Sequence, residues 1–322
     1  MEGAFAGMSR AVVTGGAGFI GRWLVKALLD DGWEVAALDD LSNGSLDNLA
    51  ELSADPHLEF VAGSIDDRKA VERTFAGGAD VCFHLAAKIN VQNSIDDPVG
   101  TFAPDVIGTL EVLEAARSAG APFLFMSSCM VYARAGDEPI GEEHPVRPAS
   151  PYAASKLAGE SLTLSYGLSY DHPVTVVRPF NTYGPFQRAD GEGGVVAIFC
   201  RRALDRQPIE VFGDGTQTRD LLYVADCADF LLRSVATEAA HGQIVNAGTG
   251  RDLTINELAE IIGGGDLDVA HTVHPHPQAE IARLVCDTTK ADQLLGWRPE
   301  TSLEEGIART SEWMKVGQCV PK

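Results

Sequence analysis

The sequence predicts an α/β protein with a Rossmann-type, doubly wound parallel sheet and a smaller C-terminal lobe. Three observations support this prediction. The chain opens with a strand, a glycine-rich loop, a helix and a second strand, and further short apolar strands then alternate with helices. After Phe180 the alternation becomes irregular. Continuous apolar strands separated by helices are typical of a parallel sheet that is covered on both faces.

The first unit is a βαβ motif of about the usual ~30 residues. Residues 11–14 form a short apolar strand, and Phe19–Asp30 reads as a helix that Gly32 ends. Residues 34–38 form the second strand, which leads into Asp39 and Asp40. The motif predicts a dinucleotide-binding half-domain.

Further elements define two lobes. Residues 80–85 and 123–127 read as buried strands, residues 106–119 as a helix, and another helix runs from Pro151 through Leu164. Beyond Phe180, strands are expected at 209–212 and 243–246 and helices at 224–236, 255–262 and 303–314. We assign residues 9–180, with a returning segment near 217–248, to the Rossmann domain. Residues 181–216 and 249–322 form the second, substrate-binding lobe.

Composition and charge exclude several classes of protein. The 322 residues carry a formal net charge of -21, which disfavours binding to nucleic acid. No apolar run approaches the ~20 residues of a membrane-spanning helix. The six cysteines are scattered without a CxxC pair, so we expect free thiols in a reducing cytoplasm. We expect no metal, because His271, His274 and His276 lie in a proline-rich segment that reads as a loop.

The glycine loop predicts the cofactor. Gly15, Gly18 and Gly21 follow the first strand in the spacing GxxGxxG. They permit a tight turn, a close approach of the backbone to a pyrophosphate, and close packing of the helix on the strand. Asp39 stands where a carboxylate would accept both hydroxyls of an adenosine ribose and repel a 2′-phosphate, which favours NAD over NADP.

Tyr152 and Lys156 form a candidate catalytic pair. They stand four residues apart on one face of the helix that begins at Pro151. A phenol has an ordinary pKa of ~10, so it needs a nearby positive charge to act as a base. We expect the Lys156 ammonium to supply that charge.

At this point the sequence resembles the extended short-chain dehydrogenases/reductases, in particular the NAD-dependent nucleotide-sugar epimerase and dehydratase family. The resemblance extends from Thr14 to about Glu305. The matching segments are TGGAGFIG (14–21), HLAAK (84–88), SSCMVYA (127–133), SPYAASK (150–156), RPFNTYGP (178–185), GDGTQTRDLLYVAD (213–226), NAGTG (246–250) and LGWRPETSLEEG (295–306).

The resemblance implies roles for individual residues. Ser128, Tyr152 and Lys156 would be catalytic. The NAD-binding set would be Gly15, Gly18, Phe19, Ile20, Gly21, Asp39, Asn43, Gly44, Ser64, Ile65, Leu85, Ala86, Lys88, Tyr152 and Lys156. The substrate-binding set would be Ser128, Cys129, Asn181, Arg188, Arg219 and Arg283. The family often has Asp at the position of Ser64 and prefers Asn at the position of Asp105, to which no role is assigned.

The resemblance also implies a reaction. The family oxidises a nucleotide sugar at C4, and the fate of the 4-keto sugar depends on the pocket. Dehydratases usually carry Asp-Glu where this chain has Cys129 and Met130, and decarboxylases usually carry Glu in the same stretch. A thiol and a thioether cannot replace carboxylates in proton transfer. Arg188 matches an arginine that reaches the substrate carboxylate in UDP-glucuronate 4-epimerases, and a guanidinium suits that contact.

We therefore expect 4-epimerisation of UDP-glucuronate to UDP-galacturonate. The alternatives are a UDP-glucose or UDP-N-acetylglucosamine 4-epimerase, a UDP-glucuronate decarboxylase, and a non-catalytic NAD-sensing scaffold. The exact sugar, the nucleotide and the pathway stay open. By resemblance, the protein would form a homodimer through the helices that flank Val106 and Tyr152.

Overall fold

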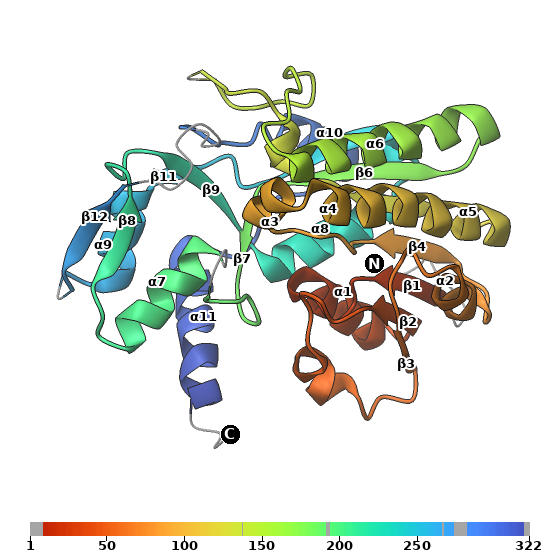
Figure 1. Ribbon diagram of the computed structural model, residues 1–322, viewed down its shortest axis with the longest axis horizontal. Helices are drawn as coiled ribbons and strands as arrows, with labels where there is room; N and C mark the ends of the chain where they lie inside the picture. Colours follow the sequence, from red (N-terminus) through yellow and green to blue (C-terminus); the bar gives the residue numbers. More distant parts are fainter. Residues whose placement is uncertain (1–8, 137, 191–193, 266, 274–281, 319–322) are drawn as a thin grey trace.

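Seven parallel strands form the central sheet of the protein (Figure 1). The computed structural model describes residues 9–136, 138–190, 194–265, 267–273 and 282–318. The strands lie in the order β10-β6-β5-β4-β1-β2-β3. Their bounds are β1 (Arg10–Thr14), β2 (Glu34–Asp39), β3 (Leu58–Ala62), β4 (Val81–His84), β5 (Phe123–Met126), β6 (Val174–Pro179) and β10 (Gln243–Ala247). The winding reverses between β1 and β4, which confirms the doubly wound fold, and ligands of such sheets bind at this point.

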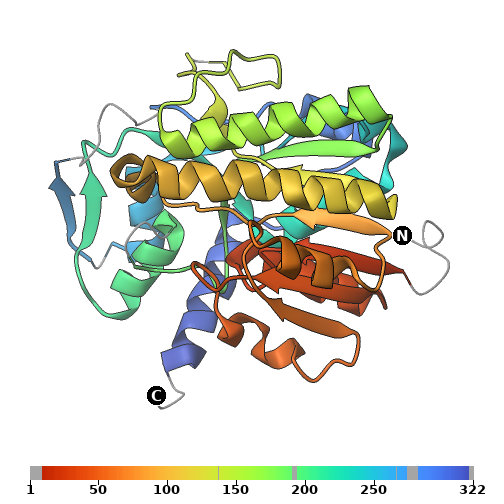
Figure 2. The same cartoon turned by 45° about the vertical axis from the view of Figure 1, so that its right-hand side comes forward.

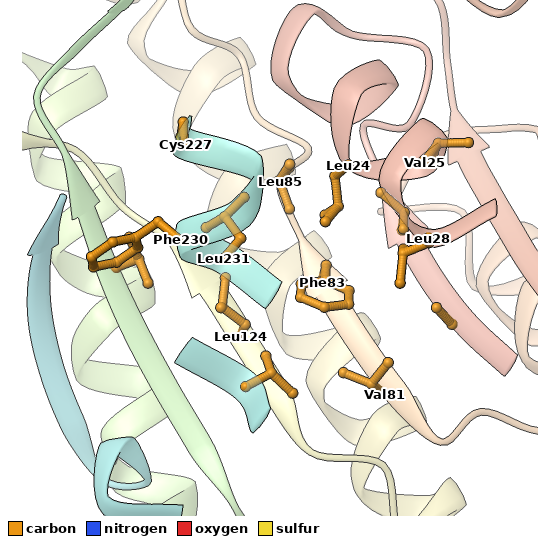
Figure 3. Close-up of a cluster of buried hydrophobic side chains, with 14 of the residues drawn as sticks. Leu24, Val25, Leu28, Val81, Phe83, Leu85, Leu124, Cys227, Phe230 and Leu231 are labelled. Carbon is orange, nitrogen blue, oxygen red and sulfur yellow. The ribbon is translucent and has the colours of Figure 1, made fainter. Parts of the chain in front are cut away.

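Helices cover both faces of the sheet. On one face α1 (Phe19–Asp30) packs against α8 (Val224–Ala236), and Figure 3 shows Leu24 and Leu28 near Phe83 and Leu231. On the other face lie α2 (Arg68–Phe75), α5 (Thr109–Ala119) and α6 (Pro151–Tyr170), and the last two run side by side in Figure 2. Burial on both faces explains why the central strands are continuously apolar.

A smaller group of elements lies beside the sheet, on the left of Figure 1. It contains a three-stranded sheet in the order β11-β9-β7 and a two-stranded sheet of β12 and β8. The bounds are β7 (Asn181–Tyr183), β8 (Ile209–Phe212), β9 (Thr218–Tyr223), β11 (Asp252–Thr254), β12 (Val269–Thr272), α7 (Val195–Leu204), α9 (Ile255–Gly263) and α11 (Leu303–Gln318). Within the predicted returning segment, α8 and β10 join the central layers, whereas β9 pairs with β7 and β11.

Short elements connect these layers. They are η1 (Leu46–Leu52), α3 (Val91–Asp96), α4 (Pro98–Ala103), η2 (Pro104–Gly108), η3 (Cys129–Val131), η4 (Glu238–Ala240) and α10 (Thr289–Leu295). Three helix boundaries differ from the predictions by more than two residues, and one of them is the end of α11, which lies at Gln318 instead of residue 314. The helix expected to begin at residue 106 is preceded by the π-helical turn η2, and α6 continues beyond Leu164 to Tyr170. Buried Tyr166 packs on the sheet, and Asp171 ends the helix in the left-handed conformation.

In the described part of the chain, no helix has the length and apolar character needed to cross a membrane. Of the three clustered histidines, His271 lies in β12, whereas His274 and His276 fall outside the described residues.

Candidate active site

The glycine loop joins β1 to α1 at the carboxyl end of the sheet. Gly15 has a φ of +72°, and a Cβ there would lie 2.9 Å from the backbone nitrogen of Ala86. A Cβ at Gly21 would lie 2.0 Å from the carbonyl oxygen of Gly15. Gly18 is the N-cap of α1 and supplies no side-chain cap, so the first N–H groups of the helix stay available to an anion. The loop therefore fits a pyrophosphate.

A cavity of about 710 Å³ runs along the carboxyl ends of β1 to β5. Apart from Tyr152 and Lys156, every residue expected to bind NAD lines it: Gly15, Gly18, Phe19, Ile20, Gly21, Asp39, Asn43, Gly44, Ser64, Ile65, Leu85, Ala86 and Lys88. The cavity is also lined by residues that the sequence analysis did not assign, including Ser42, Asn48, Asn90 and Asp105. Its length from the glycine loop to Met126 at the end of β5 suits an extended dinucleotide.

Asp39 ends β2 and is buried at the cavity wall. Its two oxygens accept the backbone N–H groups of Ala17, at 3.0 Å, and Leu41, at 2.8 Å. Burial raises the pKa of this carboxyl, and the two hydrogen bonds oppose that rise. A carboxylate oxygen can accept more than one hydrogen bond, so the ribose contact expected of Asp39 is sterically and chemically compatible with its structural role.

Lys88 lies in the loop after β4 and also lines the cavity. Its ammonium donates to Asp40 at 2.9 Å and to Ser42 at 2.7 Å, while its backbone nitrogen donates to Asp105 at 2.8 Å. Asp40 is therefore one half of an ion pair.

The expected catalytic residues come together at the ends of β5 and α6. Tyr152 and Lys156 share the buried face of α6, and Ser128 lies in the loop after β5. The Ser128 side chain hydrogen-bonds to the Tyr152 hydroxyl. The Lys156 ammonium donates to the carbonyl oxygen of Met126 at 2.9 Å and lies 5.2 Å from the centre of the Phe125 ring.

The electrostatics of the pair are dominated by burial. Burial raises the pKa of Tyr152, and the hydrogen bond from Ser128 opposes the rise only in part. Burial also lowers the pKa of Lys156. The pKa of Tyr152 is therefore set mainly by burial, and the lowering expected from Lys156 stays a prediction.

Cys129 and Asn181 are two of the residues expected to bind the substrate. Cys129 is buried next to Ser128, and burial raises the pKa of its thiol to about 12. Asn181 begins β7, and its amide oxygen is buried without a hydrogen-bond donor among the described residues. The amide oxygen and nitrogen of Asn181 can exchange places by a flip. This position can therefore offer a ligand either a hydrogen-bond acceptor or a donor.

Arg219 and Arg283 are both connected to the small sheet of β9 and β11, although they are far apart in sequence. Arg219 is in β9, opposite Leu253 of β11, and its guanidinium donates to the Thr218 carbonyl at 2.7 Å. Arg283 donates to Asp252 of β11 at 3.0 Å. Arg219 thus belongs to this small sheet, and Arg283, which lies outside its strands, is joined to it through Asp252.

Arg188 lies in the loop after β7 and lines the large cavity. Its guanidinium forms two hydrogen bonds with Asp190, at 2.9 and 3.0 Å, and 60% of its side chain is exposed. A substrate carboxylate would have to displace Asp190. An exposed ion pair of this kind contributes only about 0.2–1 kcal/mol, so the displacement is energetically accessible.

Two residues without a role predicted from the sequence, Asp105 and Ser155, also belong to this site. Asp105 is buried in η2 and accepts hydrogen bonds from the Lys88 backbone and, at 2.9 Å, from the Ser155 hydroxyl. The exchange of Asn for Asp at position 105 was the only signal in the sequence, because Ser155 lies 50 residues further along the chain.

The doubly wound sheet, the glycine-lined cavity and the buried tyrosine–lysine pair define a dinucleotide-dependent enzyme. Residues 11–248 match the NAD dependent epimerase/dehydratase family, and the chain belongs to that family. Its members depend on NAD, which is therefore the cofactor.

Known proteins agree with this assignment. The chain is 41% identical over 310 residues to a UDP-glucose 4-epimerase of Mycolicibacterium smegmatis, covering 95% of this chain and 98% of the relative. It is 33% identical over 304 residues to UDP-glucuronic acid decarboxylase 2 of Arabidopsis thaliana, covering 92% of this chain and 66% of that protein.

Solved structures have the same fold. Pal from Bacillus thuringiensis is 51% identical with a TM-score of 0.92, and the match covers 95% of this chain and 99% of Pal. UDP-glucose 4-epimerase from Thermus thermophilus in complex with NAD is 34% identical with a TM-score of 0.86, over 95% of this chain and 99% of that protein.

Proposed function

We propose that the protein catalyses 4-epimerisation of a UDP-sugar through a transient 4-keto sugar. The observation that carries the proposal is the buried group formed by Ser128, Tyr152 and Lys156, which is joined through Lys156 to Met126 at the cavity wall. In this proposal residues 9–180, together with α8 and β10, bind the cofactor, and the group of elements around β7, β9 and β11, which carries Arg219, holds the nucleotide sugar.

The three side chains divide the proton chemistry. Tyr152 removes the proton from the sugar C4 hydroxyl, and Ser128 hydrogen-bonds to that hydroxyl. Lys156, which is fixed to the Met126 carbonyl, stabilises the phenolate electrostatically. NAD supplies the acceptor and donor of the hydride when it is bound. Return of the Tyr152 proton to the opposite epimer then completes the reaction.

The pocket favours epimerisation over elimination. Cys129 is buried with a thiol pKa of about 12, and the half-buried Met130 has no ionisable group. Neither can act as the acid or base that loss of water across C5 and C6 requires near neutral pH. We therefore expect the 4-keto sugar to be reduced again and not to lose water.

For the sugar we propose a neutral UDP-hexose such as UDP-glucose, in keeping with the 41% identical relative. UDP-glucuronate is the second candidate, because Arg188 lines the cavity and could exchange Asp190 for a substrate carboxylate. The pairing of Arg188 with Asp190 makes this the weaker candidate.

The test is to incubate the NAD-loaded protein separately with UDP-glucose, UDP-N-acetylglucosamine and UDP-glucuronate and to identify products by NMR. A 4-epimer from a neutral sugar supports the proposal, and a 4-epimer from UDP-glucuronate alone supports the second candidate. Formation of UDP-xylose would establish decarboxylation instead. NAD binding without turnover of any UDP-sugar would favour a non-catalytic scaffold.

We also propose that the protein is a homodimer. Exposed apolar side chains gather on α3, α4 and η2, next to α6: Ile95, Val99, Phe102 and Ile107. Contiguous exposed apolar surface of this kind is typical of an interface. Light scattering should give twice the monomer mass, and Val99→Asp with Phe102→Asp should give the monomer mass.

A further inference from the structure

Asp105 is a buried acidic side chain beside the proposed catalytic pair. Only 4% of its surface is exposed. One oxygen accepts the Lys88 backbone N–H at 2.8 Å, and the other accepts the Ser155 hydroxyl at 2.9 Å. It therefore ties the cofactor-lining loop after β4 to helix α6.

These two contacts are compatible with a negatively charged Asp105. A backbone N–H can only donate. The Ser155 hydroxyl lies 2.9 Å from the Asp105 carboxyl and 2.8 Å from the Tyr152 carbonyl oxygen, so its one proton can be shared between these two acceptors. Burial raises the pKa of Asp105, whereas Lys156, Lys88 and the two hydrogen bonds lower it. The two lysines thus offset part of the cost of burying the charge, and the pKa of Asp105 stays above its ordinary value.

The other charges around Lys156 are already balanced. Two carboxylates raise the pKa of Lys156, those of Asp105 and Glu160. Glu160 forms a buried, doubly hydrogen-bonded ion pair with Arg178, at 2.8 and 2.6 Å. The Glu160 charge is therefore neutralised mainly by Arg178. Asp105 is then the carboxylate that can balance the charge of Lys156.

Two other titratable groups near the pair, Lys88 and His84, cannot supply the negative charge that Asp105 supplies. Lys88 pairs with Asp40 at 2.9 Å. His84, on β4, is buried between the hydroxyls of Thr14 and Thr109, and burial lowers its pKa to about 3, so it is neutral.

The thiol of Cys129 also acts on Tyr152, but burial raises the thiol pKa to about 12 and keeps it neutral as well. The charge balance at the pair therefore depends on Asp105 and Lys156.

We propose that Asp105 is a positioning residue that carries a negative charge in the folded protein and holds Lys156 in its ammonium form beside Tyr152. This inference rests on the proposed function, in which Tyr152 is the proton acceptor. An asparagine at this position could make both hydrogen bonds but would supply no charge. Asp105 thus sets the pH range in which the pair works.

The sign of the effect follows from the charges. The carboxylate raises the proton affinity of both Lys156 and Tyr152. Its removal should lower both, so the phenolate forms at lower pH and the ammonium is lost at lower pH. We expect both limbs of the pH–rate profile to move down by about one pH unit.

The experiment compares Asp105→Asn with Ser155→Ala. The asparagine variant removes the charge and can keep the hydrogen bonds, whereas the alanine variant removes one hydrogen bond and keeps the charge. The first readout is the pH dependence of UDP-sugar turnover. The second needs no turnover: the near-ultraviolet absorbance of the phenolate is titrated in the NAD-loaded protein, with Tyr152→Phe subtracted to isolate Tyr152.

The inference predicts that Asp105→Asn lowers the Tyr152 midpoint and both limbs by about one pH unit and that Ser155→Ala leaves them within a few tenths. An unchanged midpoint in Asp105→Asn would overturn it, because Asp105 would then be neutral. An equal shift in Ser155→Ala would also overturn it, since the hydrogen bond and not the charge would be responsible.

Two further provisions keep the test decisive. If Asp105→Asn does not fold, as judged by thermal unfolding, Asp105→Ser removes the same charge with a smaller side chain. If the wild-type protein converts no UDP-sugar, the proposed function fails, while the spectroscopic titration of Tyr152 still decides the role of Asp105.

Discussion

The buried ion pair between Glu160 on α6 and Arg178 on β6 makes a sharp prediction about stability. Their side chains are 2% and 3% exposed, and two charge-assisted hydrogen bonds join them. Glu160 also accepts a hydrogen bond from Ser127, and Arg178 lies 4.6 Å over the ring of Tyr132. Glu160→Gln preserves the shape of the side chain but leaves the guanidinium buried without its countercharge.

Removal of one partner of such a pair costs about 3–5 kcal/mol of unfolding free energy. Urea unfolding of the NAD-free protein, followed by circular dichroism, measures the loss. The matched control is the double variant Glu160→Leu with Arg178→Met, which buries no charge and should recover at least about half of that loss. A single variant that loses under about 1 kcal/mol, or a double variant less stable than the single, would refute the reasoning.

Three further predictions concern the cofactor loop, a buried histidine and the substrate. Gly21→Ala places a methyl group 2.0 Å from the Gly15 carbonyl oxygen, so calorimetry should find NAD affinity at least about tenfold weaker, a loss of 1.4 kcal/mol or more. His84 is held neutral with a pKa of about 3, below its unfolded value of about 6.5. Its contribution to stability is therefore lost as pH falls from about 6.5 toward 3, by up to about 1.4 kcal/mol per unit, and His84→Asn should flatten that slope in urea unfolding. Arg188→Met should leave the KM for UDP-glucose within about twofold but raise any KM for UDP-glucuronate at least tenfold, since a charged hydrogen bond contributes about 1.5–3 kcal/mol.

The sequence predicted the local elements that have strong local signals. Helix α1 has the predicted bounds, because the glycine loop starts it and Gly32 follows its end. The edge strand β3 was not identified; among its residues only Val61 is buried, so its hydrophobic pattern is weak. The end of α6 was placed too early, because the burial of Tyr166 against the sheet stabilises a last turn that is poor in helix-forming residues.

The site was predictable to the extent that it follows family motifs. The residues expected to contact NAD line one cavity because they end successive parallel strands. The charge balance could not be predicted, because it depends on contacts between residues far apart in sequence, such as Asp105 with Ser155. Likewise, the motif around Arg188 gave no indication that Asp190, two residues later, would occupy its guanidinium.

The central claim, that Tyr152 moves the proton of the sugar hydroxyl, is tested most directly by Tyr152→Phe. The phenyl ring fills the same buried space, so NAD affinity should stay within about threefold of wild type, while turnover of UDP-glucose should fall by about 10²–10⁴-fold, the usual contribution of a positioned acid–base group. Turnover within about tenfold of wild type, with NAD still bound, would contradict the account.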